Sequence, residues 1–96
     1  MEILVTYDVA TETAAGRRRL RKVAKLCEGY GQRVQKSVFE CMLDEQQLLV
    51  LEDKLVRSID HDRDSLRIYR LREPYQRYVQ SYGVDHHRDF RDPLVL

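Results

Sequence analysis

Residues 2–8, EILVTYD, constrain the fold of this 96-residue chain more than any other segment. The run is rich in β-branched and aromatic residues and is apolar on both alternating sets of positions, which is typical of a central strand covered on both faces. A chain this short buries only about 60 to 65% of its unfolded surface, so a face left apolar is expected to meet a partner. A second copy is the commonest partner, and the sequence therefore predicts a homodimer.

The next two segments predict a helix and a broken strand. Residues 13–29 place four apolar side chains on one helical face: Leu20, Val23, Ala24 and Cys27. We expect the glycines around Tyr30 to end this helix, because glycine supplies the left-handed conformation common at helix C-termini. Residues 33–43 are dense in β-formers but long for one strand, which favours two short strands with a bend near Lys36 and Ser37.

The second half of the chain predicts a helix, a strand and a C-terminal arm. Asp44 and Gln47 fit an N-cap, and the apolar positions of a helix follow at Leu48, Leu51, Leu55 and Ile59. A polar link at 60–64 precedes a half-buried strand at 66–71, which Pro74 closes. Residues 75–82 suit another strand or an extended arm, and the apolar residues 94–96 suit a small edge strand.

This order of elements is the split βαβ pattern of ferredoxin-like folds. We predict an α+β βαββαβ sandwich, with a four-stranded antiparallel sheet, two helices on one face and a short C-terminal strand. The subunit should dimerise through its sheet face, with residues 1–75 forming the domain and residues 76–96 forming an arm at the dimer interface. Because many unrelated activities use this architecture, function has to be argued from individual residues.

Asp8 is the first candidate site residue, because it lies where the apolar strand ends and a loop begins. A carboxylate is a hard oxygen ligand that suits Mg²⁺, which often takes one or two carboxylates and keeps its waters. A two-fold axis near the first strand would bring two Asp8 side chains to one shared ion. The alternative role is ordinary turn chemistry, in which Asp8 caps the loop at 9–11.

Clustered basic residues are the second candidate. The net charge is only +1, although charged residues make up 34% of the chain, so attraction to nucleic acid has to come from local clusters. Residues 16–25, GRRRLRKVAK, carry Arg and Lys without one acid. Guanidinium groups bind phosphate oxygens well, whereas a solvated helix face is the alternative explanation. A further series at Arg67, Arg70, Arg72 and Arg77 would extend such a surface.

Other features narrow the class of protein. Cys27 and Cys41 lack CxxC spacing, which favours two buried thiols in a reducing cytoplasm over a disulfide. We expect neither a signal peptide nor a transmembrane span. His61, His86 and His87 lie in polar turn regions with nearby aspartates, where solvated loop histidines are favoured over a metal site.

Four segments together resemble a known family. They are the strand end Tyr7-Asp8-Val9, the GRRRLRKVAKL helix, the EGYGQRVQKSVFEC segment and the DSLRIYRL strand. In this order they resemble the second CRISPR-associated (Cas) adaptation protein, over residues 1–72. RVQKSVFEC is the most specific block.

The resemblance implies a cytoplasmic ferredoxin-like homodimer that joins CRISPR integrase dimers in a heterohexameric complex and binds duplex DNA during spacer acquisition. Many members of the family are described as metal-dependent endonucleases acting on RNA or DNA. Carried onto this chain, the resemblance implies that Asp8 is the catalytic metal ligand, with one Mg²⁺ shared by two subunits. It implies that Tyr7 and Phe39 shape the site, and that the nucleic-acid contacts are Arg17, Arg18, Arg19 and Arg33.

Three functions therefore compete. The first is a Mg²⁺-dependent phosphodiesterase centred on paired Asp8, which lacks an evident general base nearby in the sequence. The second is a structural adaptor that braces duplex DNA between integrase dimers without cutting it. The third is a ferredoxin-like regulatory module for a small ligand, which the basic helix and the lack of a glycine-rich ligand loop make the weakest.

Overall fold

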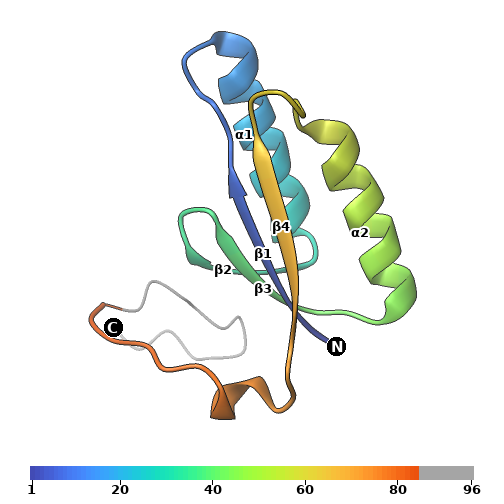
Figure 1. Cartoon of the computed structure of the whole chain (residues 1–96), viewed down its shortest axis with the longest axis vertical. Helices are drawn as coiled ribbons and strands as arrows, with labels where there is room; N and C mark the ends of the chain where they lie inside the picture. Colours follow the sequence, from blue (N-terminus) through green and yellow to red (C-terminus); the bar gives the residue numbers. More distant parts are fainter. Residues whose placement is uncertain (85–96) are drawn as a thin grey trace.

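The computed structural model describes residues 1–84, which form a four-stranded antiparallel sheet and two α-helices. The strand order is β2-β3-β1-β4, so the first strand is central, and Figure 1 shows α1 and α2 running alongside each other. The predicted α+β ferredoxin-like βαββαβ fold is confirmed. Its elements are β1 (Glu2–Asp8), α1 (Ala14–Glu28), β2 (Gly31–Gln35), β3 (Val38–Met42), α2 (Glu45–Ser58), β4 (Ser65–Leu71) and the 3-10 helix η1 (Tyr75–Arg77).

The two faces of β1 have different surroundings. Ile3, Val5 and Tyr7 are buried in one core with residues of β3 and of both helices, so the helices cover this face. Leu4 and Thr6 alternate with them and point to the opposite face, as does Asp8. We call this opposite side the open face. Apolar residues on both sides of β1 thus face a core covered by α1 and α2 on one side and a surface that no α-helix covers on the other.

Local capping signals in the sequence are confirmed where they are strongest. Thr13 caps α1, its hydroxyl oxygen accepting a hydrogen bond from the Gly16 N–H at 3.0 Å. Asp44 and Gln47 form a reciprocal capping box at the start of α2, with hydrogen bonds of 2.8 and 3.0 Å. Each cap fixes the direction from which the chain enters its helix.

The glycines after α1 do not have the conformation predicted for them. Gly29 has φ −72° and ψ −14°, a right-handed conformation, so the predicted left-handed cap is wrong. Gly31, in contrast, lies where β2 passes β3. A methyl group there would overlap the Cys41 sulfur and the Glu40 carbonyl oxygen. The close approach of the two strands, and not the helix cap, requires a glycine.

The predicted break in the 33–43 segment is confirmed. A two-residue turn at Lys36 and Ser37 separates β2 from β3, and their pairing shifts register between Arg33 and Gln35. The strand pair begins two residues earlier than predicted, at Gly31, because the glycine belongs to the sheet.

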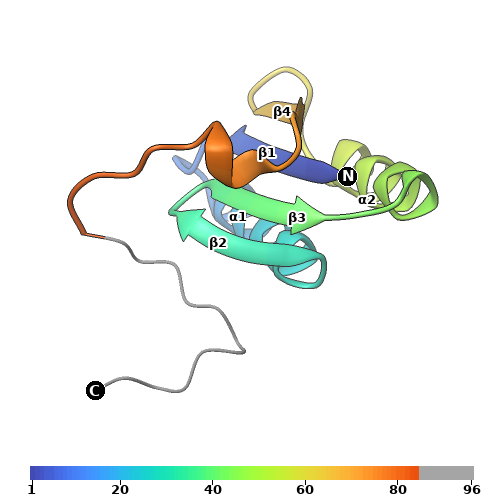
Figure 2. The ribbon, with the colours of Figure 1, turned by 90° about the horizontal axis from the view of Figure 1, so that it is seen from below.

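The chain after β4 departs from the strand alternative predicted for 75–82. Pro74 opens one turn of 3-10 helix, in which the Tyr78 N–H donates to the Tyr75 carbonyl oxygen at 2.8 Å. The chain then continues without regular structure to residue 84, and Figure 2 shows this orange segment leaving the sheet. Proline lacks the N–H that a sheet ladder needs, which disfavours a strand at this point. Residues 94–96 lie outside the described part.

No helix within residues 1–84 is long and apolar enough to cross a membrane.

A pair of glycine variants tests the strand approach. Gly31→Ala should lower the free energy of unfolding by about 1 to 3 kcal/mol, because the added methyl group meets backbone and a buried sulfur. Gly29→Ala is the matched control and should be neutral or stabilising by up to about 1 kcal/mol, since its backbone is right-handed and its new contacts are ordinary. Urea unfolding measures both, and equal losses would contradict the assignment.

Candidate metal and nucleic-acid site

Asp8 lies on the open face at the end of the central strand. It pairs in register with Ser65 of β4, and its side chain is exposed. Within residues 1–84 no side chain or backbone group makes a hydrogen bond or ion pair with its carboxylate. The expected turn-capping role is therefore not performed by Asp8 in the described structure, and its oxygens are available to a ligand.

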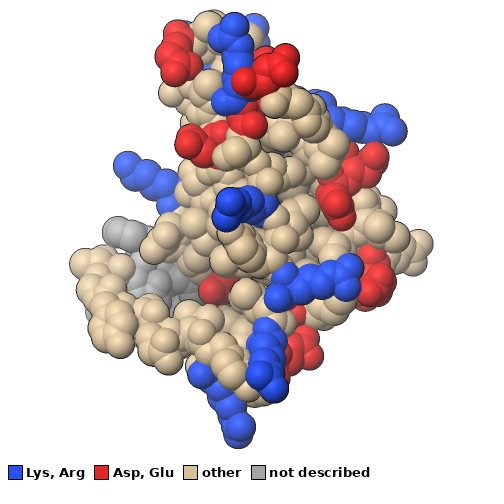
Figure 3. Space-filling model, viewed as in Figure 1, with Lys and Arg blue, Asp and Glu red and all other residues tan. Residues whose placement is uncertain are grey.

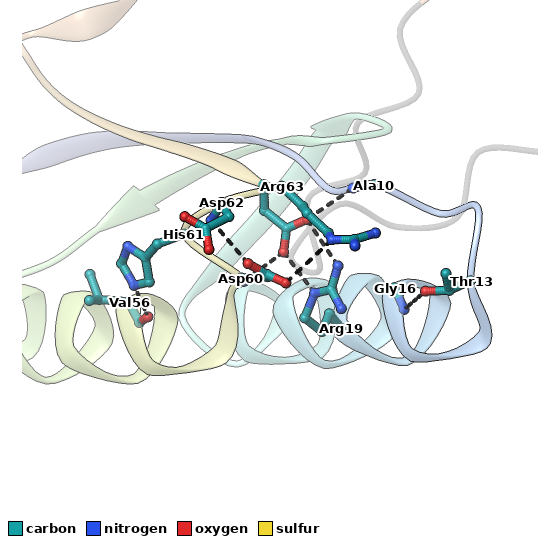
Figure 4. A network of polar contacts seen from close by, with 10 residues as sticks. Ala10, Thr13, Gly16, Arg19, Val56, Asp60, His61, Asp62 and Arg63 are labelled. Atoms are coloured by element: carbon teal, nitrogen blue, oxygen red, sulfur yellow. Dashed lines mark hydrogen bonds and ion pairs between the residues drawn. The ribbon is translucent and has the colours of Figure 1, made fainter.

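Asp64 performs the capping role instead. Its Oδ1 accepts a hydrogen bond from the Ala10 N–H at 3.0 Å, and its Oδ2 accepts one from the Asp60 N–H at 2.8 Å. Arg19 binds both oxygens, with Nε 2.8 Å from Oδ2 and Nη2 3.3 Å from Oδ1. The Asp64 side chain is fully buried, and Figure 4 shows this network joining the loops around α1.

No pattern in the sequence singles out Asp64. The residue lies in a link with three aspartates, and only its place at the start of the DSLRIYRL segment distinguishes it. The hydrogen bond with Arg19 is the main cause that lowers its pKa to about 2, and the backbone N–H groups of Asp60 and Ala10 add to the effect against the cost of burial. Asp64 thus stays ionised under ordinary conditions.

The ionised Asp64 carboxylate should make the stability of the fold depend on pH in the acid range. Its pKa in the folded state, about 2, is below its ordinary value of 3.8, so its stabilisation is complete above the ordinary value and is lost as pH falls through the folded one. We expect the free energy of unfolding to decrease from about pH 5 toward pH 2. Asp64→Asn should be less stable at neutral pH and flatter across this range in urea unfolding.

The control for that measurement is Asp62→Asn, because Asp62 is an exposed neighbour in the same loop. It should keep the wild-type acid dependence. An Asp64→Asn variant with an unchanged acid dependence would contradict the role given to the buried carboxylate.

Tyr7, Phe39 and Arg33 form a cluster on the opposite side of the sheet from Asp8. The Tyr7 and Phe39 rings are stacked with centroids 6.2 Å apart, and the Arg33 guanidinium lies 5.1 Å from the Phe39 centroid. Arg33 also pairs with Glu28 at 3.7 Å. The cluster supports the strand that carries Asp8 from behind, so the structure does not bring these three side chains beside its carboxylate.

The Tyr7 hydroxyl is buried and makes no hydrogen bond of standard geometry within the described residues. Burial raises the pKa of Tyr7, and the nearby Arg33 guanidinium offsets only part of that rise. The hydroxyl therefore stays protonated at neutral pH.

Exposed cations follow one face of α1. They occur at helical spacing and form no ion pair within residues 1–84: Arg18, Arg21, Lys22 and Lys25. We call these four residues the α1 stripe. Arg17 differs, because its Nη1 donates to the Thr11 carbonyl oxygen at 3.2 Å, and Arg19 differs because it binds Asp64.

The later arginines do not form one surface with the α1 stripe. Arg67 lies on the open face and donates to the Tyr69 hydroxyl at 2.8 Å, whereas Arg70 lies on the other face and pairs with Glu45 at 3.4 Å. On the face seen in Figure 3, basic and acidic side chains are interspersed. Concentrated positive charge is therefore a property of α1 and not of the whole molecule.

The open face also carries a groove of about 840 Å³ between the sheet and the chain after β4. Its apolar lining includes Leu4, Val38 and Leu71 from the sheet and Val79 from the segment that follows. Val79 is 40% exposed. The groove shows that this face keeps apolar surface uncovered in one subunit.

Other metal ligands are not assembled in the described part of the chain. No group of three or more His, Cys, Asp or Glu side chains within residues 1–84 is placed to hold an ion. His61 contacts the Val56 carbonyl oxygen at 3.0 Å, while His86 and His87 lie outside the described residues. Cys27 and Cys41 are free thiols, and burial raises their pKa values to about 12 and about 11, which keeps them protonated.

The fold and the site define a class: a ferredoxin-like subunit with an unpaired carboxylate at the end of its central strand and an uncovered sheet face. The family model described as CRISPR associated protein Cas2 matches residues 1–79. The chain belongs to the Cas2 family, as the resemblance implied.

Relatives with curated names match the whole chain. "CRISPR-associated endoribonuclease Cas2 1" of Moorella thermoacetica is 60% identical over 100% of both chains. "CRISPR-associated endonuclease Cas2" of Halalkalibacterium halodurans is 52% identical, again over 100% of both. The crystal structure of Streptococcus pyogenes Cas2 at pH 6.5 is 53% identical with a TM-score of 0.79, covering 86% of this chain and 100% of that one. The nuclease names of the Moorella and Halalkalibacterium relatives support the predicted class of enzyme.

Proposed function

We propose that this chain is a Mg²⁺-dependent endonuclease subunit of a CRISPR adaptation complex, with Asp8 as the metal ligand and catalytic residue. One observation carries the proposal. Asp64 accepts the hydrogen bond from the loop after β1, which leaves the Asp8 carboxylate exposed and without a partner in the described structure. A carboxylate at a strand end that makes no structural contact can bind a ligand, and the strand holds it on a rigid support.

The residues of one subunit fit Mg²⁺ only in part. Asp8 is a hard oxygen donor, but no group of three or more His, Cys, Asp or Glu side chains within residues 1–84 is placed to hold an ion. Mg²⁺ accepts a site of one or two carboxylates and water. Two subunits related by an axis through the open face would contribute one Asp8 each, so we infer one ion for each homodimer.

The groups on this face suggest a division of roles. A bound Mg²⁺ would polarise the phosphodiester and lower the pKa of a water molecule. Asp8 would hold the ion, while Ser65, opposite it in register, and Arg67, two residues further along β4, can donate hydrogen bonds to phosphate oxygens. Neither side chain is a general base at neutral pH. The proposed chemistry therefore relies on orientation and charge more than on a side-chain base.

Replacement of the carboxylate tests this role. Asp8→Asn keeps the shape of the residue but removes its charge, and it should reduce Mg²⁺-dependent cleavage of RNA or duplex DNA by at least about 100-fold. Calorimetry should find one Mg²⁺ or Mn²⁺ for every two wild-type chains and none for the variant. Asp62→Asn, which alters an exposed carboxylate of another loop, is the control and should cleave normally. Cleavage by Asp8→Asn at the wild-type rate would remove Asp8 from catalysis.

The homodimer is proposed to form through the open face. The groove there exposes apolar side chains from β1, β3 and β4, and a small domain rarely leaves such a surface uncovered. The same face carries Asp8, so one contact between subunits would both cover the groove and pair the carboxylates. We retain the proposal that residues 76–96 act as an arm at this interface.

Two valines of nearly equal exposure test the interface. Val79 lines the groove at 40% exposure, and Val56 lies on α2 at 39% exposure. Val79→Glu should shift the protein from dimer to monomer in analytical ultracentrifugation, because a charge would be desolvated at the contact. Val56→Glu should leave the dimer intact. Dissociation by Val56→Glu alone would place the contact on α2 and contradict the proposal.

The adaptor is the second candidate function, and the α1 stripe favours it. Its four cations lie on the helix layer, whereas Asp8 lies on the open face, so a duplex could bind without reaching the metal site. In this role a cytoplasmic dimer would brace duplex DNA and dock CRISPR integrase dimers in a heterohexamer. If the Asp8→Asn variant loses cleavage but still supports spacer acquisition, bracing the duplex is the main function and cleavage is secondary.

A further inference from the structure

We propose that Arg19 and Asp64 are positioning residues for Asp8, and that Arg19 is not a phosphate contact. This inference rests on the proposed metal role of Asp8. Arg19 belongs to the same basic run as Arg18, but the structure gives the two residues different surroundings. The Arg19 side chain is 20% exposed and bound to Asp64, whereas Arg18 is exposed and unpaired within residues 1–84.

Asp64 occupies one edge of the Arg19 guanidinium, and only 20% of the Arg19 side chain is exposed to a second anion. Its Nε and Nη2 engage both oxygens of one carboxylate in a two-point contact. Each Asp64 oxygen also accepts one backbone N–H, from Ala10 or from Asp60, so the carboxylate accepts four hydrogen bonds in all. A carboxylate has about four such acceptor positions, and all are used. Removing Arg19 would leave a buried negative charge without its counter-charge.

Asp64 contacts the loop that follows Asp8 and directly precedes the residue that lies opposite Asp8 in the sheet. Ala10, two residues after Asp8, donates its N–H to Asp64. Ser65, directly after Asp64, is the register partner of Asp8 across the β1–β4 pair. One buried side chain therefore fixes the loop that follows Asp8 and the start of the strand opposite it, and both settle where the Asp8 carboxylate points.

Gly16 restrains the same loop from the helix side. A methyl group on Gly16 would overlap the Ala10 carbonyl oxygen, so α1 packs directly against the loop backbone there. The Gly16 N–H binds the Thr13 hydroxyl oxygen, which sets the first turn of α1 in place. Ala10 is thus held at its N–H by the hydrogen bond to Asp64, which Figure 4 shows, and at its carbonyl by close packing against Gly16.

The first experiment separates positioning from phosphate binding. Binding of a 20-base-pair duplex is measured over a series of KCl concentrations for the wild-type protein, Arg18→Gln and Arg19→Gln. Each lost phosphate contact should reduce the slope of log K against log salt by about 0.9. We expect Arg18→Gln to flatten the slope and Arg19→Gln to leave it unchanged. An equal flattening by both variants would overturn the inference for Arg19.

The second experiment follows the metal site. Mn²⁺ affinity, measured by electron paramagnetic resonance on the full chain, should fall about tenfold in Arg19→Gln and in Asp64→Asn, as expected when a supporting group of a ligand is lost. The double variant should be no worse than Asp64→Asn alone, because both changes remove one interaction. Arg19→Lys, which keeps the charge, should recover part of the affinity. Wild-type affinity in Arg19→Gln and Asp64→Asn would overturn the inference.

A stability control excludes a general loss of structure. Leu55→Ala removes a fully buried side chain of α2 outside the Asp64 network, so it should destabilise the fold by forming a cavity and leave Mn²⁺ affinity unchanged. Equal weakening of Mn²⁺ binding by Leu55→Ala would show that Arg19 and Asp64 act only through overall stability.

The two proposals fail in different ways. A wild-type protein that binds no Mn²⁺ would overturn the proposed metal site. The salt slopes, together with hydrogen exchange of the Ala10 amide, would still decide whether Arg19 serves the loop or the nucleic acid. Faster Ala10 exchange in Arg19→Gln, at an unchanged salt slope, is the expected result for a positioning residue.

Discussion

The buried carboxylate of Asp64 is the interaction on which the functional end of this fold depends. It joins three segments that are separate in the sequence: the β1–α1 loop, the first half of α1 and the link between α2 and β4. A buried ionised group is costly unless it is paired and fully hydrogen-bonded, and Asp64 meets both conditions. The same bonds that satisfy it also give the end of β1 a fixed backbone.

Different residues therefore support the backbone at the end of β1 and remain available to bind a ligand. Asp64 is buried, and all the acceptor positions of its carboxylate are used. Asp8, only two residues before the Ala10 N–H that Asp64 binds, has an exposed carboxylate. The aromatic pair of Tyr7 and Phe39 belongs to the supporting side, behind the sheet. Arginines divide likewise, because Arg19 and Arg33 have carboxylate partners and the α1 stripe has none within residues 1–84.

Local features of the fold were predictable because their signals lie within a few residues of one another. The bend at Lys36 and Ser37 and the capping box at Asp44 are examples, as are the alternating strands. Asp64 was not predictable in this way, since two of its partners, Ala10 and Arg19, lie 54 and 45 residues away in the chain. The same limit applies to Gly31, which has no room for a side chain because residues of β3 lie against it. Asp8 was found from its place at a strand end, but its freedom from other partners is visible only in three dimensions.

The central position of β1 also restricts how related sequences can vary. Side chains alternate between the two faces with a period of two, so inserting or deleting one residue between Val5 and Asp8 would turn one end of the strand to the opposite face relative to the other end. With Ile3 and Val5 kept in the core, the Asp8 carboxylate would then point toward the core as well. Changes of length are thus confined to the loops and the C-terminal segment, while the distance from the start of β1 to Asp8 behaves as a fixed unit of the architecture.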